Sequence, residues 1–266
     1  MIRAAVAGAC GRMGNAIIQT IGSTDGVQLR GALEHEKHPR LGQTIDAPNL
    51  PDGNIPITSG VESVSGKVDV LIDFTTPEGS LKNLEVCAEI GLPAVIGTTG
   101  LGEEHKEALG MFALRTPTVF SPNMSVGVNV LFRLAAMAAT ALGDDYDVEI
   151  VETHHRMKKD APSGTALGLA EVVAQALGRN LADDAVYSRH GMIGERTKDE
   201  IGIQTIRAGD IVGEHTLLLA GPGERVELTH RAHSRDNFAL GAVRAALWVT
   251  GKEPGLYSMA DVLELK

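Results

Sequence analysis

The chain has 266 residues, 43% of them hydrophobic and 22% charged, a composition typical of a globular protein with one large domain or two ordinary ones. Its formal net charge of −10 argues against a general role in binding nucleic acid or anionic membranes. Two cysteines are too few for a disulfide framework and favour a reducing cytoplasm. No signal peptide is expected, because the first apolar run is short and lightly charged.

The first part of the chain has the pattern of a mononucleotide-binding unit. A strand is expected over residues 2–7, a helix over 15–21 and a second strand over 27–33. Glu34 ends the second strand and lies 20 residues after Gly14. In such units glycines let the backbone approach a pyrophosphate at the helix N-terminus, and the acid accepts hydrogen bonds from a ribose hydroxyl. The pattern therefore predicts dinucleotide binding.

The glycine spacing departs from the usual fingerprint. Gly8, Gly11 and Gly14 give G-x-x-G-x-x-G instead of G-x-G-x-x-G, and Cys10 lies between the first two. The strand before the glycines and the acid after them still support dinucleotide binding.

Strands and helices alternate as far as about residue 125. Residues 35–65 contain four prolines and are expected to form an irregular excursion over the surface. Further strands are expected at 68–74, 93–96 and 117–120, and a helix at 77–90, between the capping residue Thr76 and Gly91. The alternation predicts a doubly wound parallel sheet, with ligands at the carboxyl ends of its strands.

The pattern changes at about Val126. The longest apolar run, 126–142, is interrupted by Asn129 and Arg133 and is expected to be a buried or amphipathic helix, not a membrane span.

Three strand-like runs follow, at 201–207, 215–219 and 225–229. Their short connections predict that each run is the antiparallel neighbour of the next, within a second, α+β domain. The run 215–219 is apolar on both faces, which suggests burial against another subunit. The final helix, 237–249, is expected to pack back on the first domain.

A basic cluster follows another strand-like run, 148–151. The cluster comprises His154, His155, Arg156, Lys158 and Lys159 and ends at Pro162-Ser163-Gly164-Thr165, directly before the helical pattern 166–177. Free backbone N–H groups at a helix start, close to positive charges, attract an anion. A histidine four residues before a lysine adds a proton donor to a fixed charge. The stretch predicts a site where a small anionic substrate is held and protonated.

Two other interpretations of the cluster remain open. A basic run in an acidic protein is commonly a solvated surface. Adjacent histidines can suggest a metal, but neighbouring side chains rarely reach one ion and no cysteine lies nearby, so no metal site is predicted.

The chain resembles the 4-hydroxy-tetrahydrodipicolinate reductases, also called dihydrodipicolinate reductases, over essentially its whole length. The motifs that carry the resemblance are Gly11-Arg12-Met13-Gly14, Gly97-Thr98-Thr99-Gly100, Ser125-Val126-Gly127-Val128-Asn129, residues 152–165 and residues 207–215. Within them, His-His-x-x-Lys-x-Asp-Ala-Pro-Ser-Gly-Thr is highly specific to that family. The resemblance implies a Rossmann-type α/β domain from residues 1–125 plus 236–266. It also implies a substrate-binding α+β domain with a mixed or antiparallel sheet, 126–235, that assembles a homotetramer.

The resemblance also implies a role for each site residue. His154 corresponds to the catalytic proton donor and Lys158 to its cationic partner. The positions that correspond to substrate contacts are His155, Gly164 and Thr165. The positions that correspond to cofactor contacts are Gly8, Ala9, Cys10, Gly11, Arg12, Met13, Glu34, Gly97, Thr98, Thr99, Ser121, Pro122, Asn123 and Met124.

The implied reaction is the reduction of a small dicarboxylate by NADH or NADPH in diaminopimelate and lysine biosynthesis, with no nucleic acid or membrane partner. Glu34 favours a free ribose 2′-hydroxyl, and His35 stands where many relatives carry Arg, so NADH is expected to serve at least as well as NADPH. Two alternatives remain. A dehydrogenase of another small acid would not need the paired anion site. A non-catalytic nucleotide-binding module would not need His154 or Lys158.

Overall fold

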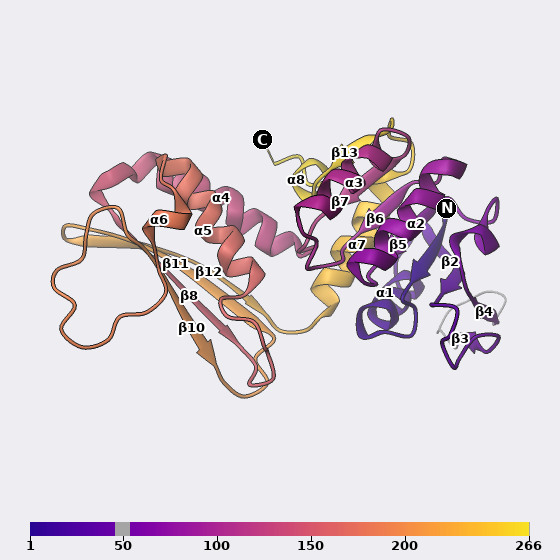
Figure 1. Ribbon diagram of the computed structural model, residues 1–266, viewed down its shortest axis with the longest axis horizontal. Coiled ribbons are helices and arrows are strands. Elements are labelled where there is room, and N and C mark those ends of the chain that lie inside the picture. The colour runs from indigo at the N-terminus through magenta and orange to yellow at the C-terminus, as the bar shows by residue number, and fades with distance from the viewer. Residues whose placement is uncertain (46–53, 266) are drawn as a thin grey trace. The chain divides into compact units, whose positions relative to one another are not determined.

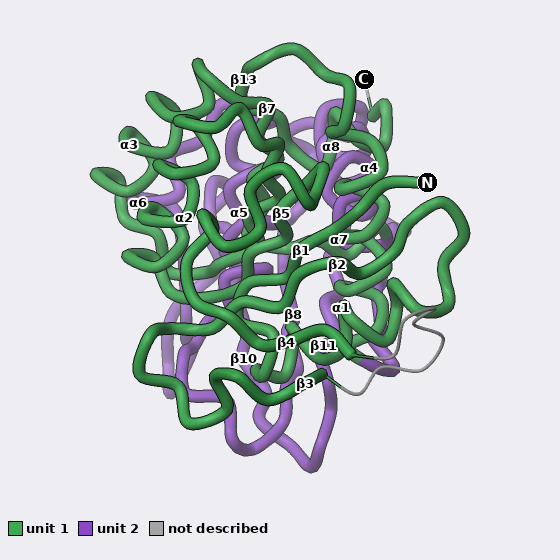
Figure 2. The backbone as a smooth tube through the Cα atoms, turned by 90° about the vertical axis from the view of Figure 1, so that its right-hand side faces the viewer, with its two compact units in different colours: residues 1–126, 235–266 green, residues 127–234 purple. Residues whose placement is uncertain are grey.

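A computed structural model of the chain describes residues 1–45 and 54–265. The chain forms two compact units, coloured separately in Figure 2. Unit 1 comprises residues 1–126 and 235–266, and unit 2 comprises residues 127–234.

Unit 1 is built on an eight-stranded sheet with the order β13-β7-β6-β5-β1-β2-β4-β3. All neighbouring strands are parallel except β3 and β4. The strands are β1 (Ile2–Ala7), β2 (Val27–Leu33), β3 (Thr44–Ile45), β4 (Ile55–Thr58), β5 (Val70–Asp73), β6 (Ala94–Ile96), β7 (Pro117–Phe120) and β13 (Gly255–Tyr257). The predicted doubly wound parallel sheet is confirmed.

Helices cover both faces of this sheet (Figure 1). They are α1 (Arg12–Gly22), α2 (Pro77–Ile90), α3 (Glu103–Ala113), α7 (Asp236–Val249) and α8 (Met259–Val262), with a 3₁₀ turn at Val61–Val64. Successive residues of β1 point to opposite faces, as the pleat of a strand requires. Ala4 and Val6 pack in the core formed with α1 and α7, while Ala5 and Ala7 pack in the core formed with α2 and α3.

The segment 35–65 differs from the expected irregular excursion, in the part of it that the structure describes. β4 lies within this segment and extends the main sheet by pairing in parallel with β2. Its residue Ile57 is 1% exposed and belongs to the core. The prolines concealed this strand, since Pro56 is exposed and prolines are tolerated in strands near a sheet edge. Residues 46–53, which include two of the prolines, lie outside the described residues.

Unit 2 holds a five-stranded sheet with the order β12-β11-β8-β10-β9. Its strands are β8 (Asp147–His154), β9 (Ala185–Val186), β10 (Ile201–Arg207), β11 (Gly213–Gly221) and β12 (Glu224–Ala232). Its helices are α4 (Val126–Leu142), which begins at the end of unit 1, α5 (Gly164–Leu177) and α6 (Leu181–Asp184), with a 3₁₀ turn at Gly143–Asp145. Apolar residues of α4 and α5 pack on one face of the sheet and form a single core with β8, β10 and β11.

The expected pairing of β10 with β11 is wrong. β8 lies between them, parallel to β10 and antiparallel to β11, so the sheet is mixed. The connection from β10 to β11 passes round the end of β8. The Ala208 N–H donates to the His154 carbonyl at 2.9 Å, and the Arg156 N–H donates to the Gly209 carbonyl at 3.2 Å. A short connection therefore does not make its two strands neighbours here. The expected antiparallel pair of β11 and β12 is confirmed.

Residues Val126–Asp145, which include α4, are long and apolar enough to cross a membrane by length and composition alone. One such helix is weak evidence, because core helices of globular proteins meet the same criterion. In this fold Leu131, Ala135 and Ala139 line one side of α4 and are buried in the core of unit 2.

Candidate active site

The glycine turn between β1 and α1 needs glycine at its first and last positions. Gly8 has a φ of 73°, in the left-handed region that favours glycine. A Cβ on Gly14 would lie 2.0 Å from the Gly8 carbonyl oxygen. Gly11 is the N-cap of α1 and has no side chain to cover the first turn. The glycines thus leave the backbone at the N-terminus of α1 open to close approach, which a bound pyrophosphate requires.

Glu34, at the carboxyl end of β2, is held against this turn. The Cys10 N–H donates to Glu34 Oε1 at 2.8 Å, and both residues are half-buried. A hollow of about 540 Å³ lies alongside. Its lining residues are Cys10, Gly11, Arg12, Asn15, Ala16, Gln19, Arg235 and Asp236. Two guanidinium groups and one carboxylate line this hollow beside a helix N-terminus, and the net positive charge suits an anion.

A buried polar network supports the loop after β6. Thr98 Oγ1 lies 2.6 Å from Ser80 Oγ, which donates to Asp73 Oδ1 at 2.8 Å. The ring of Phe74 covers Gly97 so closely that a Cβ there would lie 2.1 Å from it. Contacts with Ser80 and Phe74 therefore fix Gly97 and Thr98, while Thr99 is exposed.

The loop after β7 is tied by its own polar groups. Ser121 Oγ donates to the Asn123 carbonyl at 2.7 Å, and Pro122 is exposed. Met124 is 1% exposed with its side chain in the core, so this side chain is not available to a ligand. The expected cofactor residues thus lie at the carboxyl ends of β1, β2, β6 and β7, four strands of one parallel sheet.

In unit 2, the expected proton donor lies at the end of a strand beside a buried acid. His154 is the last residue of β8, and Glu152 shares its face of the strand and is fully buried. Their Nδ1 and Oε2 atoms lie 2.6 Å apart. Arg207, the last residue of β10, donates to both oxygens of Glu152 at 2.9 Å each. The Ser163 N–H donates to Oε1 at 3.0 Å.

These donors keep Glu152 ionised. Burial alone would raise the pKa of the carboxyl, but the hydrogen bonds from His154, Arg207 and the Ser163 N–H outweigh it and lower the pKa to about 2. An ionised carboxylate only accepts, so Nδ1 of His154 carries a proton and donates to it. Nε2 is then the ring nitrogen left to exchange a proton with a ligand.

Gly213, the first residue of β11, lies against this second nitrogen. A Cβ on Gly213 would lie 2.9 Å from Nε2 of His154. Glycine at this position therefore keeps a methyl group away from the nitrogen that exchanges the proton.

The turn from His155 to Ser163 leads into α5. Ser163 caps this helix by accepting from the Ala166 N–H at 3.2 Å, and Gly164 and Thr165 form its first turn. The peptide bond Ala161–Pro162 is cis. The first turn of a helix carries partial positive charge, which favours an anion beside it.

Lys158 and His155 lie in the same turn, and both are half-buried. Lys158 Nζ lies 2.9 Å from Asp160 Oδ2, and the Lys158 N–H donates to the His155 carbonyl at 3.1 Å. The structure thus brings His154, Lys158 and the start of α5 into one connected turn of unit 2.

Three groups of this site, Glu152, Arg207 and His215, have no role predicted from the sequence. The Nε2 atom of buried His215 lies 3.1 Å from Ser163 Oγ, and burial lowers the pKa of this histidine to about 3. A signal existed for Glu152, because residues two apart on a strand share a face. Arg207 and His215 are the first and last residues of the motif 207–215 that carries the resemblance, but only the pairing of their strands with β8 places them beside Glu152 and His154.

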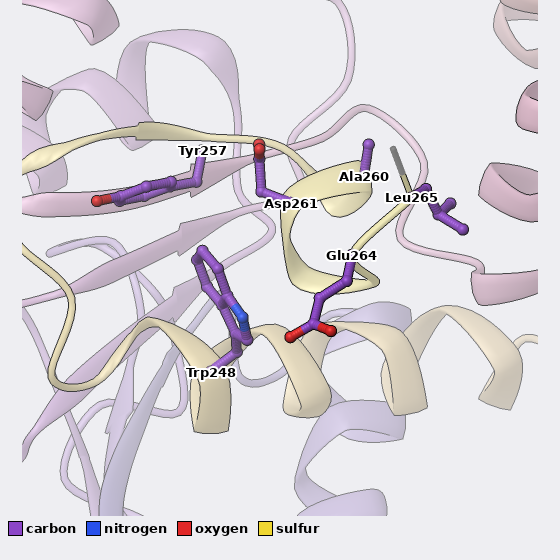
Figure 3. Close-up of a pocket in the computed structure, with 6 residues that line it drawn as sticks. All are labelled: Trp248, Tyr257, Ala260, Asp261, Glu264 and Leu265. Atoms are coloured by element: carbon purple, nitrogen blue, oxygen red, sulfur yellow. The ribbon is translucent and has the colours of Figure 1, made fainter.

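A second hollow, of about 470 Å³, lies at the end of α7 and contains none of the expected site residues. Figure 3 shows Trp248, Tyr257 and Glu264 around it. The two rings pack edge to face with centroids 5.1 Å apart, and Lys252 Nζ lies 4.3 Å from the Trp248 ring centroid. These contacts serve packing at the end of unit 1.

Comparison with known proteins gives consistent matches along the chain. The family described as "Dihydrodipicolinate reductase, N-terminus" matches residues 2–124, and "Dihydrodipicolinate reductase, C-terminus" matches residues 127–263. The 4-hydroxy-tetrahydrodipicolinate reductases of Syntrophobacter fumaroxidans and Syntrophotalea carbinolica are each 55% identical to the chain, over 100% of both sequences in each pair.

A solved structure agrees with these matches. The dipicolinate-bound dihydrodipicolinate reductase from Paenisporosarcina sp. TG-14 is 27% identical, with a TM-score of 0.77 over 98% of each chain. The chain therefore belongs to the dihydrodipicolinate reductase family of oxidoreductases.

Proposed function

We propose that this protein reduces 4-hydroxy-tetrahydrodipicolinate to tetrahydrodipicolinate with NADH or NADPH, in diaminopimelate and lysine biosynthesis. Family membership supports the reaction. The observation that carries the assignment of roles is the buried contact between Glu152 and His154. Residues 155–163 connect this pair to the N-terminus of α5.

The dinucleotide binds to unit 1 in this proposal. Within the predicted stretch from Gly8 to Met13, the pyrophosphate accepts from the N–H groups of Arg12 and Met13 at the start of α1, because the other four N–H groups donate within the protein. Glu34 accepts from a ribose hydroxyl while its Oε1 holds the Cys10 N–H. The loops Gly97–Thr99 and Ser121–Met124 surround the nicotinamide, which supplies the hydride when bound. The Met124 side chain takes no part, because it is buried in the core.

The substrate binds to unit 2. A carboxylate that binds Lys158 has to displace the 2.9 Å contact with Asp160. A second carboxylate accepts from the backbone N–H groups of Gly164 and Thr165 at the start of α5. His155 contributes to the same pocket from the turn before them.

His154 supplies the proton. Hydride addition to the ring moves electron density toward the ring nitrogen and its neighbouring carbon, and a donor has to meet that charge. Glu152 holds the proton on Nδ1, so that an imidazolium at His154 donates from Nε2 and is left neutral with its Nδ1–H bond intact.

An absorbance assay tests this function. The protein is mixed with NADH and the freshly made condensation product of pyruvate and aspartate semialdehyde, and loss of the reduced nicotinamide band is followed. We expect His154→Ala to lose about 10² to 10⁴ in kcat, Lys158→Ala a similar amount with a higher KM, and His155→Ala to act mainly on KM. His190 gives a matched control, since it is exposed and lies outside the site, and His190→Ala should leave both constants unchanged.

We also propose a homotetramer that works in the cytoplasm. The face of the unit 2 sheet opposite α4 and α5 carries Val151, Ile206 and Leu218, and Ile206 is 45% exposed in the single chain. Covering such a face with another subunit contributes roughly 25 cal/mol per Å². Light scattering that gives a monomer at micromolar concentration contradicts this assembly. The free thiols of Cys10 and Cys87 suit a reducing compartment.

A further inference from the structure

Three side chains of different chemistry meet beside the glycine turn. The Cys10 Sγ, a carboxylate oxygen of Glu34 and a ring nitrogen of His38 all lie within 4.8 Å of one another. Each of the three residues is half-buried. Over residues 1–45 and 54–265, this is the one group of three such side chains with ligand atoms so close.

The three come from different parts of the chain and are held in place by backbone contacts. Cys10 lies in the turn after β1, and its N–H fixes Glu34 at the end of β2. His38 lies in the turn after β2, where its N–H donates to the His35 carbonyl at 2.8 Å. The ring of His35 packs edge-on against that of His38, with centroids 5.3 Å apart. The separation along the sequence explains why spacing alone does not reveal the group.

A thiolate, an imidazole and a carboxylate are the ligand types that Zn²⁺ takes in proteins. Zn–S near 2.3 Å and Zn–N or Zn–O near 2.1 Å give ligand separations of about 3.3–3.6 Å in a tetrahedron. From a limit of 4.8 Å, each pair has to close by at most about 1.2–1.5 Å, which side-chain rotation supplies. Three protein ligands leave a fourth position for water, as is usual where solvent has access.

The charges around the group set the protonation of the Cys10 thiol before and after a cation binds. Burial, and next the Glu34 carboxylate, raise the pKa of the Cys10 thiol, while Arg40 acts in the opposite direction. The unmetallated thiol is therefore protonated and a poor target for oxidation. A bound divalent cation displaces the thiol proton to solvent and supplies positive charge next to Glu34.

Metal binding replaces the contacts that Arg40 makes with His38 and with the Cys10 thiol. The Arg40 N–H donates to His38 Nδ1 at 3.2 Å. A metal on Nδ1 replaces this exposed bond, and a metal on Nε2 moves the ring proton to Nδ1 with the same result. The Arg40 guanidinium is exposed and can move away from the cation.

We propose that Cys10, Glu34 and His38 bind a borderline-soft divalent cation, represented by Zn²⁺, at the end of β2. Because the Cys10 N–H holds Oε1 of Glu34, Oε2 is the oxygen left for either a metal or a ribose hydroxyl. Zn²⁺ and the dinucleotide therefore exclude each other, a consequence that rests on the proposed function, whereas metal binding itself does not.

Equilibrium dialysis of the full chain with Zn²⁺ alone, without cofactor or substrate, tests the site. We expect one Zn²⁺ per chain, and a weakening of at least about tenfold in Cys10→Ala and in His38→Ala. Co²⁺ as a second probe should give a thiolate charge-transfer band that Cys10→Ala removes. Cys87→Ala and His105→Ala are the matched controls, since they remove a thiol and an imidazole of unit 1 outside the group, and both should bind as the wild type does.

Competition is measured by repeating the dialysis at increasing NADH. The Kd for Zn²⁺ should rise in proportion to NADH above the Kd of the cofactor. Zn²⁺ binding that is unchanged in Cys10→Ala and His38→Ala overturns the site. Simultaneous binding of Zn²⁺ and NADH overturns the competition. If Zn²⁺ binds through these residues and NADH does not bind at all, the proposed function fails and the metal site stands.

Discussion

Replacing Glu152 with Gln tests whether the buried carboxylate organises the proton donor. The change keeps the shape of the side chain and removes its charge. Glu152 accepts from His154 Nδ1, from both terminal nitrogens of Arg207 and from the Ser163 N–H. An amide offers one accepting oxygen and adds an NH₂ group, so at least one of these donors then faces another donor.

The loss in rate follows from the charge that His154 loses. A hydrogen bond to a charged group contributes about 1.5–3 kcal/mol, and two unit charges about 4 Å apart at an effective dielectric near 20 attract by about 4 kcal/mol. Taking about 1.5–4 kcal/mol as the range, kcat should fall by about 10- to 1,000-fold.

The assay is the NADH-dependent reduction, together with the melting temperature of each variant. Glu149→Gln is the matched control, since Glu149 lies on the same strand and pairs with Arg189 at 2.8 Å and Arg196 at 3.2 Å, on the opposite face. It should cost stability but leave kcat within about twofold. ¹⁵N spectra of labelled histidine give an independent measure, because neutral His154 should carry its proton on Nδ1.

A folded Glu152→Gln protein that keeps more than half of the wild-type kcat would refute this role of Glu152. So would a neutral His154 protonated on Nε2 in the wild type. Equal losses in Glu152→Gln and Glu149→Gln would show that general destabilisation causes the effect.

Three further predictions concern the neighbouring groups. Gly213→Ala adds a methyl about 2.9 Å from His154 Nε2, and kcat should fall at least tenfold in steady-state assays with little change in melting temperature; an unchanged kcat means that Nε2 is not the donating atom. His215 has a folded pKa of about 3 against 6.5 in the unfolded chain, so the unfolded state binds more protons between these values and stability is lost as pH falls below 6.5. Urea unfolding should show up to about 1.4 kcal/mol per pH unit from this residue, absent in His215→Asn, and equal slopes for both proteins would contradict it. Glu34 repels a 2′-phosphate, so NADH should serve at least as well as NADPH; a kcat/KM more than about tenfold higher with NADPH rules this out.

Local patterns in the sequence were enough to predict much of unit 1. Helix α2 begins after Thr76 and ends at Gly91 as expected, because a capping threonine, a first-turn proline and a left-handed glycine act on their own segment. Strand β4 was missed because its two isoleucines, Ile55 and Ile57, form too short an alternation to outweigh the prolines around them. The order of strands in unit 2 was also partly missed, since pairing depends on which chain segment packs beside β8 and not on connection length.

The candidate site divides in the same way. His154, Lys158 and the start of α5 are close in sequence, so a single stretch predicts them together. Glu152 is recognisable as part of the same site only once its face of β8 is known to be buried. Arg207 meets Glu152 because β10 pairs with β8, a contact between residues far apart in the chain. The buried charge network of Glu152, His154 and Arg207 could therefore be recognised only once the fold was known.

Helix α7 has a consequence for the order of folding. Its residues Ala239, Ala242, Val243 and Ala246 are buried in the core that α1 and β1 also form, although more than two hundred residues separate the two ends of that core. During synthesis from the N-terminus, the first 126 residues emerge with one face of their sheet covered only in part, by α1, whereas unit 2 is continuous and can close on its own. Unit 1 has to wait until residue 249 has left the ribosome. Nascent chains stalled between residues 126 and 235 should therefore expose the apolar face of β1 and recruit chaperones.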